Sequence, residues 1–325
     1  MLWLNGGPGC SSIASGLLFE HGPCAVKPGG NDTVHNPHSW NEHVNIIYLD
    51  EPIGTGYSYA SDGSTVDTLA DLAADVYAFM SLFLKRYPQY ALAPFHVAAE
   101  SWGGHYGPHV VSYIYQQNQA FVYYPRKGMV YINLASLIIA NGLTEPYSQF
   151  ESIPDYKCGG APYPYLDPSS WTCRTMKANK PVCLGLISAC YRSKTKAACT
   201  AATAHCWPAL MSGSKDNNTT LRLLAADLSN STTDETVNQY DIRMPCEAGS
   251  QLCYAELDDA AKWMNKLSVR QVLGADTHRE FLTCNSTVNS GFYLQGQAMI
   301  NSAELLPKLL GHGIRLLVYA GDVGG

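Results

Sequence analysis

The chain has 325 residues, of which 46% are hydrophobic and 15% charged, and its formal net charge at pH 7 is -6. This length allows one large hydrophobic core with an inserted region, and the mean hydropathy of -0.11 is typical of a soluble globular protein. The sequence has no run of lysines and arginines that would indicate nucleic-acid binding, and no apolar run of the roughly 18 residues that a membrane span needs.

The chain opens with a predicted strand at residues 2–4 and a glycine-rich loop. The loop reads Asn5-Gly6-Gly7-Pro8-Gly9-Cys10-Ser11-Ser12. Clustered glycines let a backbone approach a ligand closely, with N–H groups free to point at it. We expect no signal peptide in this chain, because its start has neither a basic flank nor an apolar stretch of adequate length.

Residues 45–49 are predicted to form a buried strand, and a helix follows. Apolar residues recur at helical spacing from Leu69 to Phe83. Thr68 and Asp71 give this helix a capping-box start, and Pro88 lies beyond its end. We assign the apolar stripe to core packing.

A serine follows the next predicted strand, Phe95–Ala99. It lies in Ala99-Glu100-Ser101-Trp102-Gly103, and a helix is predicted to continue to about Asn118. A serine on a sharp strand-to-helix turn, flanked by small residues, is typical of a nucleophile elbow. The usual first glycine of this pattern is replaced by Ala99, so an ordinary turn is the alternative.

Two more buried strands are predicted at residues 134–140 and 316–320. Strands that alternate with helices indicate an α/β fold with a mostly parallel sheet covered on both faces. The alternation stops from about Glu151 to Cys253 and a periodic pattern resumes at 255–273. We therefore predict core residues 1–150, a cysteine-rich insertion or cap at 151–253, and a second part of the core at 254–325.

Eleven cysteines argue against a reducing compartment, and eight of them lie between Cys158 and Cys253. A zinc site is the alternative, but no pair has C-x-x-C spacing and the segment has one histidine, His205. Together with sequons for N-glycosylation, the cysteines indicate the secretory pathway. The sequons begin at Asn31, Asn217, Asn218, Asn230 and Asn285.

Several motifs, in order along the whole chain, resemble the serine carboxypeptidase family, of the carboxypeptidase Y type. They lie at 2–12, 50–59, 100–106, 140–144 and 319–322. The resemblance implies an α/β-hydrolase fold, in which an oxyanion hole combines an N–H of an early glycine-rich loop with the N–H after the nucleophile. It makes Ser101 the nucleophile that forms an acyl-enzyme, and Gly7 and Trp102 the oxyanion donors.

The resemblance also assigns a site for the substrate's terminal carboxylate to Asn5, Glu20 and Glu100. Matching Glu20 requires a one-residue insertion, and a surface acid at a helix end is the alternative there. Two acids that face a third carboxylate cannot all be ionised, so we expect an acidic pH preference. Trp102 stands where the family commonly has tyrosine, either at the wall of the pocket before the scissile bond or in buried packing.

The triad departs from the family pattern. Gly324 stands where the family has its aspartate, and Asp322 is the preceding aspartate of that motif. The family's histidine would follow residue 325, and His105, His109 and His312 are interpreted as structural or exposed. We therefore expect a chain truncated at both ends that lacks the triad aspartate and histidine and is inactive as given.

Spacing and the resemblance together imply five disulfides and leave Cys24 unpaired. The expected pairs are Cys10–Cys284, Cys158–Cys173, Cys183–Cys206, Cys190–Cys199 and Cys246–Cys253.

The resulting hypothesis is a serine-type carboxypeptidase that acts on peptide or protein C-termini in a vacuole-like compartment or as a secreted protein. We expect no cofactor, no metal ion, no nucleic acid and no membrane span. The alternatives are a non-catalytic truncated pseudoenzyme and an acyltransferase on the same scaffold. Asn5 with both glutamates favours peptide binding over acyl transfer.

Overall fold

The computed structural model describes residues 1–163, 165–211, 237–247 and 249–324. The chain divides into two compact units. The first comprises Met1–Thr144, Asp259–Val288 and Ser302–Ala320, and the second comprises Glu145–Asp258, Asn289–Asn301 and Gly321–Gly325. The main segment of the second unit, Glu145–Asp258, has nearly the same bounds as the insertion predicted at 151–253. Two short segments that were predicted to belong to the second part of the core are also in this unit.

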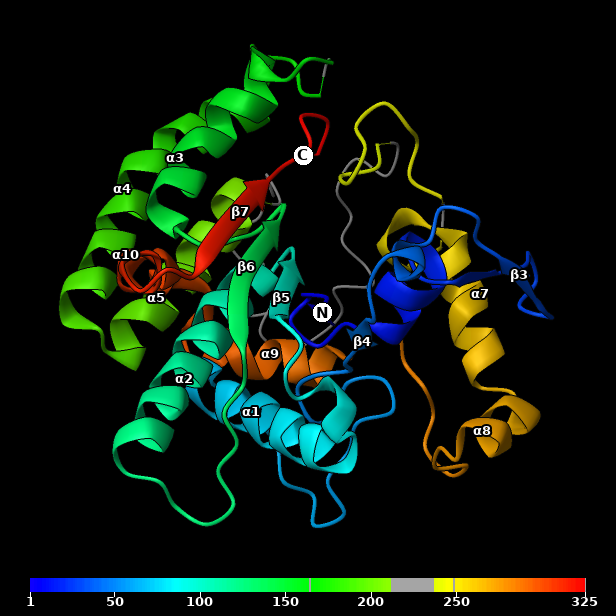
Figure 1. Ribbon diagram of the computed structural model, residues 1–325. Helices are drawn as coiled ribbons and strands as arrows, with labels where there is room; N and C mark the ends of the chain where they lie inside the picture. The colour runs from blue at the N-terminus through cyan, green and yellow to red at the C-terminus, as the bar shows by residue number, and fades with distance from the viewer. Residues whose placement is uncertain (164, 212–236, 248, 325) are drawn as a thin grey trace. The chain divides into compact units, whose positions relative to one another are not determined.

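The first unit is built on a five-stranded sheet in the order β4-β1-β5-β6-β7, and all neighbouring strands are parallel. Figure 1 shows β6 between β5 and β7. The strands are β1 (Leu2–Leu4), β4 (Ile47–Tyr48), β5 (Phe95–Glu100), β6 (Leu134–Ala140) and β7 (Arg315–Tyr319). Each lies where the sequence predicts a strand, although β4 is shorter than expected. The central strands are almost continuously apolar, as expected for a parallel sheet.

Two long helices pack together in this unit, and the second also packs against β5 and β6. Helix α1 (Leu69–Arg86) begins as predicted, because the Asp71 backbone N–H donates to the Thr68 hydroxyl at 3.2 Å. Helix α2 (Gly103–Tyr123) starts directly after the serine turn and ends later than predicted. It buries Val110, Val111 and Ile114 completely. The turn at Ser101 is therefore fixed at the junction of a buried strand and a buried helix.

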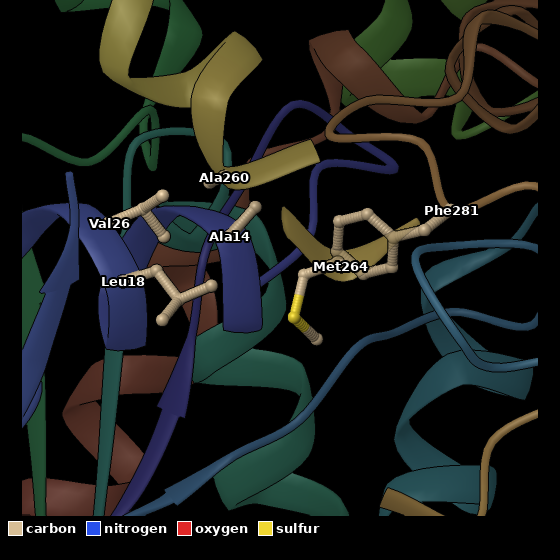
Figure 2. Close-up of a cluster of buried hydrophobic side chains, with 6 residues drawn as sticks. All are labelled: Ala14, Leu18, Val26, Ala260, Met264 and Phe281. Atoms are coloured by element: carbon tan, nitrogen blue, oxygen red, sulfur yellow. The ribbon is translucent and has the colours of Figure 1, made fainter. Parts of the chain in front are cut away.

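A second group of apolar side chains holds the π-helical turn η1 (Ile13–Glu20). Figure 2 shows side chains from η1, from β2 (Cys24–Val26) and from α7 (Ala255–Met264) pointing toward one another. The buried residues of this group, here called the η1 cluster, are Ala14, Leu18, Val26, Ala260, Met264 and Phe281. Because η1 ends at Glu20, the η1 cluster positions that carboxyl.

We expect Leu18→Ala to lower the free energy of unfolding by about 2–5 kcal/mol, since it removes a buried side chain and leaves a cavity. Urea denaturation measures the change. The matched control is Leu82→Ala, because Leu82 is 68% exposed and should change the stability by less than about 0.5 kcal/mol. Equal losses in the two variants would contradict this role of the η1 cluster.

The periodic stretch predicted at 255–273 is two helices. Helix α7 ends at Met264 and α8 (Leu267–Leu273) begins after Lys266, whose extended backbone interrupts the helix. The first unit also contains β3 (Thr33–His35), which pairs with β2, and α10 (Leu306–Gly311). Its short turns are η2 (Trp40–Glu42), η3 (Pro88–Tyr90) and η9 (Ser302–Leu305).

The second unit contains helices that the sequence analysis did not predict. They are α3 (Pro146–Asp155), α4 (Trp171–Ser193) and α5 (Lys196–Cys206). Helix α4 buries Cys173, Met176, Cys183, Ile187 and Cys190, which recur every three to seven residues on one face. Cysteines occupy core positions that leucine or valine often fill, so the apolar period is visible only when cysteine is counted as apolar.

The remaining elements are α9 (Ser286–Leu294), η4 (Tyr156–Gly160), η5 (Trp207–Met211), η7 (Gln251–Cys253) and η8 (Gln297–Met299). No helix within the described ranges combines the length and the apolar character that crossing a bilayer requires.

Five disulfides join the cysteine pairs that were expected. In the first unit, Cys10–Cys284 links the glycine-rich loop to a segment 274 residues away. The second unit holds Cys158–Cys173, Cys183–Cys206, Cys190–Cys199 and Cys246–Cys253. Cys24 in β2 forms no disulfide, also as expected. Three of these four bridges involve α4, and two of the three join α4 to α5, so the bridges hold this helix pair together.

Candidate active site

Ser101 occupies a sharp turn between β5 and α2. Its φ of 60° lies in the left-handed region, which is rare for a residue other than glycine and is expected of a nucleophile elbow. Two backbone hydrogen bonds hold this conformation from β6 and its following loop. The Ser101 N–H donates to the Ala140 carbonyl at 3.0 Å, and the Leu143 N–H donates to the Ser101 carbonyl at 2.9 Å.

The elbow is closely packed, and this explains how Ala99 is tolerated where glycine is usual. A Cβ atom on Gly103 would lie 3.0 Å from the Ala99 Cβ, and one on Gly107 would lie 3.3 Å from the same atom. The Ala99 methyl therefore fits because two glycines on the first turns of α2 leave space for it. The pattern differs from the usual one without altering the turn.

The glycine-rich loop lies directly against the elbow. A Cβ atom on Gly6 would lie only 2.4 Å from the Trp102 nitrogen and 2.8 Å from the Glu100 carbonyl oxygen. Gly7 has a φ of 108°, and a Cβ there would lie 2.8 Å from the Cys10 nitrogen. Both glycines are therefore required by close backbone contact. The structure brings together the two segments that carry the predicted oxyanion donors.

Asn5 connects the two predicted carboxylate-binding acids. Its Nδ2 donates to Glu20 Oε1 at 2.8 Å and to Glu100 Oε2 at 3.3 Å. Its Oδ1 accepts from Trp3 Nε1 at 2.7 Å and from the Gly16 N–H at 3.0 Å. These two bonds fix which side of the amide carries the N–H groups. The structure places Glu20 in this cluster, and its part in binding a substrate stays a prediction.

Both carboxyl groups are shifted toward their protonated forms. Burial, followed by repulsion from Glu100, raises the pKa of Glu20 to about 8, against the opposing hydrogen bond from Asn5. Burial raises the pKa of Glu100 to about 7, opposed by hydrogen bonds from Asn5 and the Gly6 N–H. The Glu20 side chain is 27% exposed, whereas Asn5 is buried. In acid, protonated carboxyls and the Asn5 amide can all donate to an anion.

The Trp102 side chain is buried at 2% exposure. Its ring packs against His105 at 4.8 Å and against Tyr106 at 5.1 Å between centroids. This is the buried packing that the sequence left open as the alternative to a pocket wall. The predicted oxyanion role concerns the Trp102 backbone N–H and is independent of the ring.

Among the described residues, no hydrogen bond joins the Ser101 hydroxyl to an acid or a histidine. The Ser101 hydroxyl has no hydrogen-bond partner there. His105 Nδ1 instead bonds to the Ser302 hydroxyl at 2.7 Å, and His312 Nδ1 bonds to the Lys308 carbonyl at 2.6 Å. His109 lies within α2, where burial lowers its pKa to about 4. Asp322 and Gly324 belong to the second unit, where the Asp322 carbonyl accepts a hydrogen bond from the Tyr156 hydroxyl.

The sequons differ in their surroundings. Asn31 is exposed. The Asn285 Nδ2, the atom that would carry a glycan, donates to the Gly54 carbonyl at 2.8 Å. Asn217, Asn218 and Asn230 lie outside the described residues.

The motif at residues 50–59 has a structural role, which is carried by Asp50. Asp50 accepts hydrogen bonds from the Ser11 hydroxyl at 2.6 Å, the Ile13 N–H at 3.1 Å and the Tyr57 N–H at 3.0 Å. It thereby ties the end of the glycine-rich loop to the 50–59 loop. Hydrogen bonds from backbone N–H groups to a carboxylate leave no pattern in the sequence. Asp50 could therefore be singled out only because it lies in the 50–59 motif.

The neighbouring Glu51 is 5% exposed, and neither of its carboxylate oxygens has a hydrogen-bond partner among the described residues. Burial, followed by repulsion from Asp50, raises the pKa of Glu51 well above 4.5. The folded state therefore binds this proton more tightly than the unfolded state does. The free energy of unfolding must fall as the pH rises from about 4.5 toward the folded-state pKa.

We expect Glu51→Gln to be more stable than the unsubstituted chain at pH 8, with the difference shrinking toward pH 4. Thermal unfolding at several pH values measures it. Glu256→Gln is the control, because Glu256 is exposed on α7. An equal pH dependence in the Glu51 variant and the unsubstituted chain would show that Glu51 does not hold a proton in the folded state.

Comparison with known proteins agrees with the motifs. The model of the family described as serine carboxypeptidase matches residues 1–324. Carboxypeptidase Y homolog A of Coccidioides posadasii is 38% identical over 323 residues, which are 99% of this chain and 53% of that protein. The homolog from Ajellomyces capsulatus is 36% identical over 322 residues, 99% of this chain and 52% of that protein. The chain thus spans about half the length of these relatives.

Among solved structures, the prohormone-processing carboxypeptidase Kex1(delta)p from Saccharomyces cerevisiae superposes with a TM-score of 0.73 at 25% identity, covering 99% of this chain and 65% of that one. With the parallel sheet and the elbow at Ser101, this match establishes an α/β-hydrolase fold. The chain belongs to the serine carboxypeptidase family.

Proposed function

We propose that this protein is a serine carboxypeptidase that releases C-terminal amino acids through an acyl-enzyme on Ser101. One observation carries the proposal: Asn5, Glu20 and Glu100 form a hydrogen-bonded cluster that includes the residue directly before the nucleophile. An exopeptidase must recognise a free carboxylate next to the bond it cleaves. A cluster of an amide and two protonated acids is suited to bind that carboxylate.

In this proposal the terminal carboxylate accepts hydrogen bonds from Asn5 Nδ2 and from protonated Glu20 or Glu100. The Ser101 oxygen attacks the last peptide carbonyl, and its proton passes to the histidine that the family resemblance implies. The C–N bond then breaks, the amino acid leaves with that proton, and water hydrolyses the acyl-enzyme. The N–H groups of Gly7 and Trp102 stabilise the oxyanion, and loss of one such donor typically lowers the rate about 100- to 1000-fold.

For residues 1–325 alone, we propose that carboxylate binding persists without peptidase activity. The Ser101 hydroxyl has no partner among the described residues, and Gly324 has no carboxylate with which to orient a base. An acyltransferase is disfavoured, because its acceptor need not carry the free carboxylate that the Asn5 cluster suits.

The substrates in this proposal are peptides and proteins with free C-termini, in an oxidising and acidic compartment such as a vacuole, or outside the cell. The five disulfides support an oxidising compartment. The raised pKa values of Glu20 and Glu100 support action in acid.

The test uses a chimera that continues after Asp322 with the corresponding segment of the Coccidioides posadasii relative, which supplies the implied acid and histidine. Mass spectrometry should show single residues lost from the C-terminus of a peptide at acidic pH. Amidation of the peptide should block the loss, and Ser101→Ala should abolish it. Internal cleavage, or equal cleavage of the amidated peptide, would contradict the proposed function.

A further inference from the structure

His21 directly follows Glu20 and lies in a cluster of aromatic rings. The ring stacks on Trp40 at 4.2 Å between centroids, meets Trp3 edge-on at 4.1 Å, and lies 5.6 Å from the Tyr48 ring. The residue is 8% exposed. Contacts on several sides prevent the imidazole from turning, so the directions of its two nitrogens are fixed.

The hydrogen bonds around Tyr48 determine which His21 nitrogen carries the proton. His21 Nδ1 lies 3.0 Å from the Tyr48 hydroxyl, and that hydroxyl donates its own proton to Asn41 Oδ1 at 3.4 Å. The Tyr48 oxygen is therefore left to accept from His21, so we assign the ring proton to Nδ1. In this tautomer Nε2 has a lone pair and no proton.

The lone pair of Nε2 faces Glu20. The distance from Nε2 to Glu20 Oε2 is 3.8 Å, and Nε2 is buried without a hydrogen-bond partner in the described part of the chain. The other Glu20 oxygen, Oε1, accepts from Asn5. The Nε2 lone pair, which lies beside Oε2, repels an ionised Glu20 carboxylate and attracts the proton of a carboxylic acid.

The ring is uncharged over the range in which Glu20 titrates. Burial lowers the pKa of His21 to about 4. The titratable side chains that face it are Glu20 and Tyr48, whereas Trp3, Trp40 and Asn41 from the other elements against it carry no charge.

We propose that His21 is a positioning residue of the carboxylate site, whose fixed Nε2 lone pair keeps Glu20 in the protonated form that donates to a peptide's terminal carboxylate. This inference rests on the proposed function for the identity of the ligand and deepens it. It gives the aromatic cluster of Trp3, Trp40 and Tyr48 a role in the chemistry, because the cluster sets the direction of the lone pair.

Two substitutions should lower the pH at which Glu20 titrates. His21→Phe keeps an aromatic ring against Trp40 and removes the lone pair. Tyr48→Phe removes the oxygen that fixes the tautomer, so Nε2 can carry the proton and stabilise the Glu20 carboxylate instead. We expect a fall of about half a pH unit or more in each case.

The test is a titration by NMR of residues 1–325 labelled with ¹³C at the glutamate carboxyl carbons, with Glu20 assigned by loss of its signal in Glu20→Gln. The matched control is His96→Phe. His96 is also partly buried and bonded to a hydroxyl, that of Ser136 at 2.7 Å, but it lies on β5 near the end remote from Ser101. This control should leave the Glu20 midpoint unchanged.

A lower Glu20 midpoint in both variants, with no change in the control, would support the proposal. An unchanged or higher midpoint in either folded variant would overturn it, and if His21→Phe does not fold, Tyr48→Phe decides alone because it deletes one atom. The titration is made without substrate, so it gives its answer even if the protein proves not to bind peptide carboxylates.

Discussion

Residues 1–325 produced alone are expected to hydrolyse a blocked dipeptide more than about 10⁴-fold more slowly than the chimera that carries the relative's C-terminal segment. A serine hydroxyl is a weak nucleophile without a base, and the Ser101 hydroxyl has no partner among the described residues. Gly324 cannot replace a carboxylate that orients a histidine. Substrate binding and an oxyanion hole supply only a modest acceleration by themselves in an enzyme that lacks its triad.

The assay combines dipeptide hydrolysis with labelling of Ser101 by a fluorophosphonate, after circular dichroism has confirmed that residues 1–325 are folded. Ser101→Ala in the chimera controls for contaminating peptidase. Turnover by residues 1–325 that matches the chimera and disappears in Ser101→Ala would show that another residue of this chain supplies the base.

Glu100→Gln or Glu20→Gln in the chimera should move the pH optimum of peptide hydrolysis toward neutral pH, by about half a unit to one unit. The pKa of each carboxyl is raised, to about 7 for Glu100 and about 8 for Glu20, so both donate a proton in acid and become repulsive anions as the pH rises through those values. A glutamine amide donates a hydrogen bond without needing a proton. As the pH rises, the glutamine variants therefore lose affinity for the terminal carboxylate less steeply than the unsubstituted chimera does.

The internal control for this prediction is an ester substrate that lacks the terminal carboxylate, whose pH profile should change much less in both variants. Profiles of kcat/KM against pH for the two substrates measure the difference. Peptide profiles that stay unchanged in both variants would remove Glu20 and Glu100 from carboxylate binding.

The sheet and the elbow could be predicted because their signals are local. Apolar runs mark the strands, and Ser101 follows one of them in a turn flanked by the small residues Ala99 and Gly103. The helices of the second unit could not be found by the same means, since cysteines replace the aliphatic residues that usually reveal an apolar face. The extended backbone of Lys266 divides the periodic stretch at 255–273 into two helices. The spacing of apolar residues does not reveal such a break in the backbone.

The candidate site was predicted only in part, for a related reason. Asn5, Glu20 and Glu100 came from resemblance to a family, and the structure shows that one amide joins both acids. His21 had no signal, because Trp3, Trp40 and Tyr48 are separated in the sequence and meet it only in the folded chain. The role of Asp50 likewise depends on backbone N–H groups, one at the start of η1 and one in the 50–59 loop.

The most direct test of the central claim, that Asn5, Glu20 and Glu100 bind a terminal carboxylate, is the affinity of residues 1–325 carrying Ser101→Ala for a blocked dipeptide and for its C-terminal amide. Isothermal titration calorimetry at pH 5 and pH 8 gives both dissociation constants. We predict that at pH 5 the free acid binds at least about ten-fold more tightly, the effect of one charge-assisted hydrogen bond. The preference should shrink at pH 8 and disappear in Asn5→Leu. Equal affinities for acid and amide at both pH values would contradict the claim.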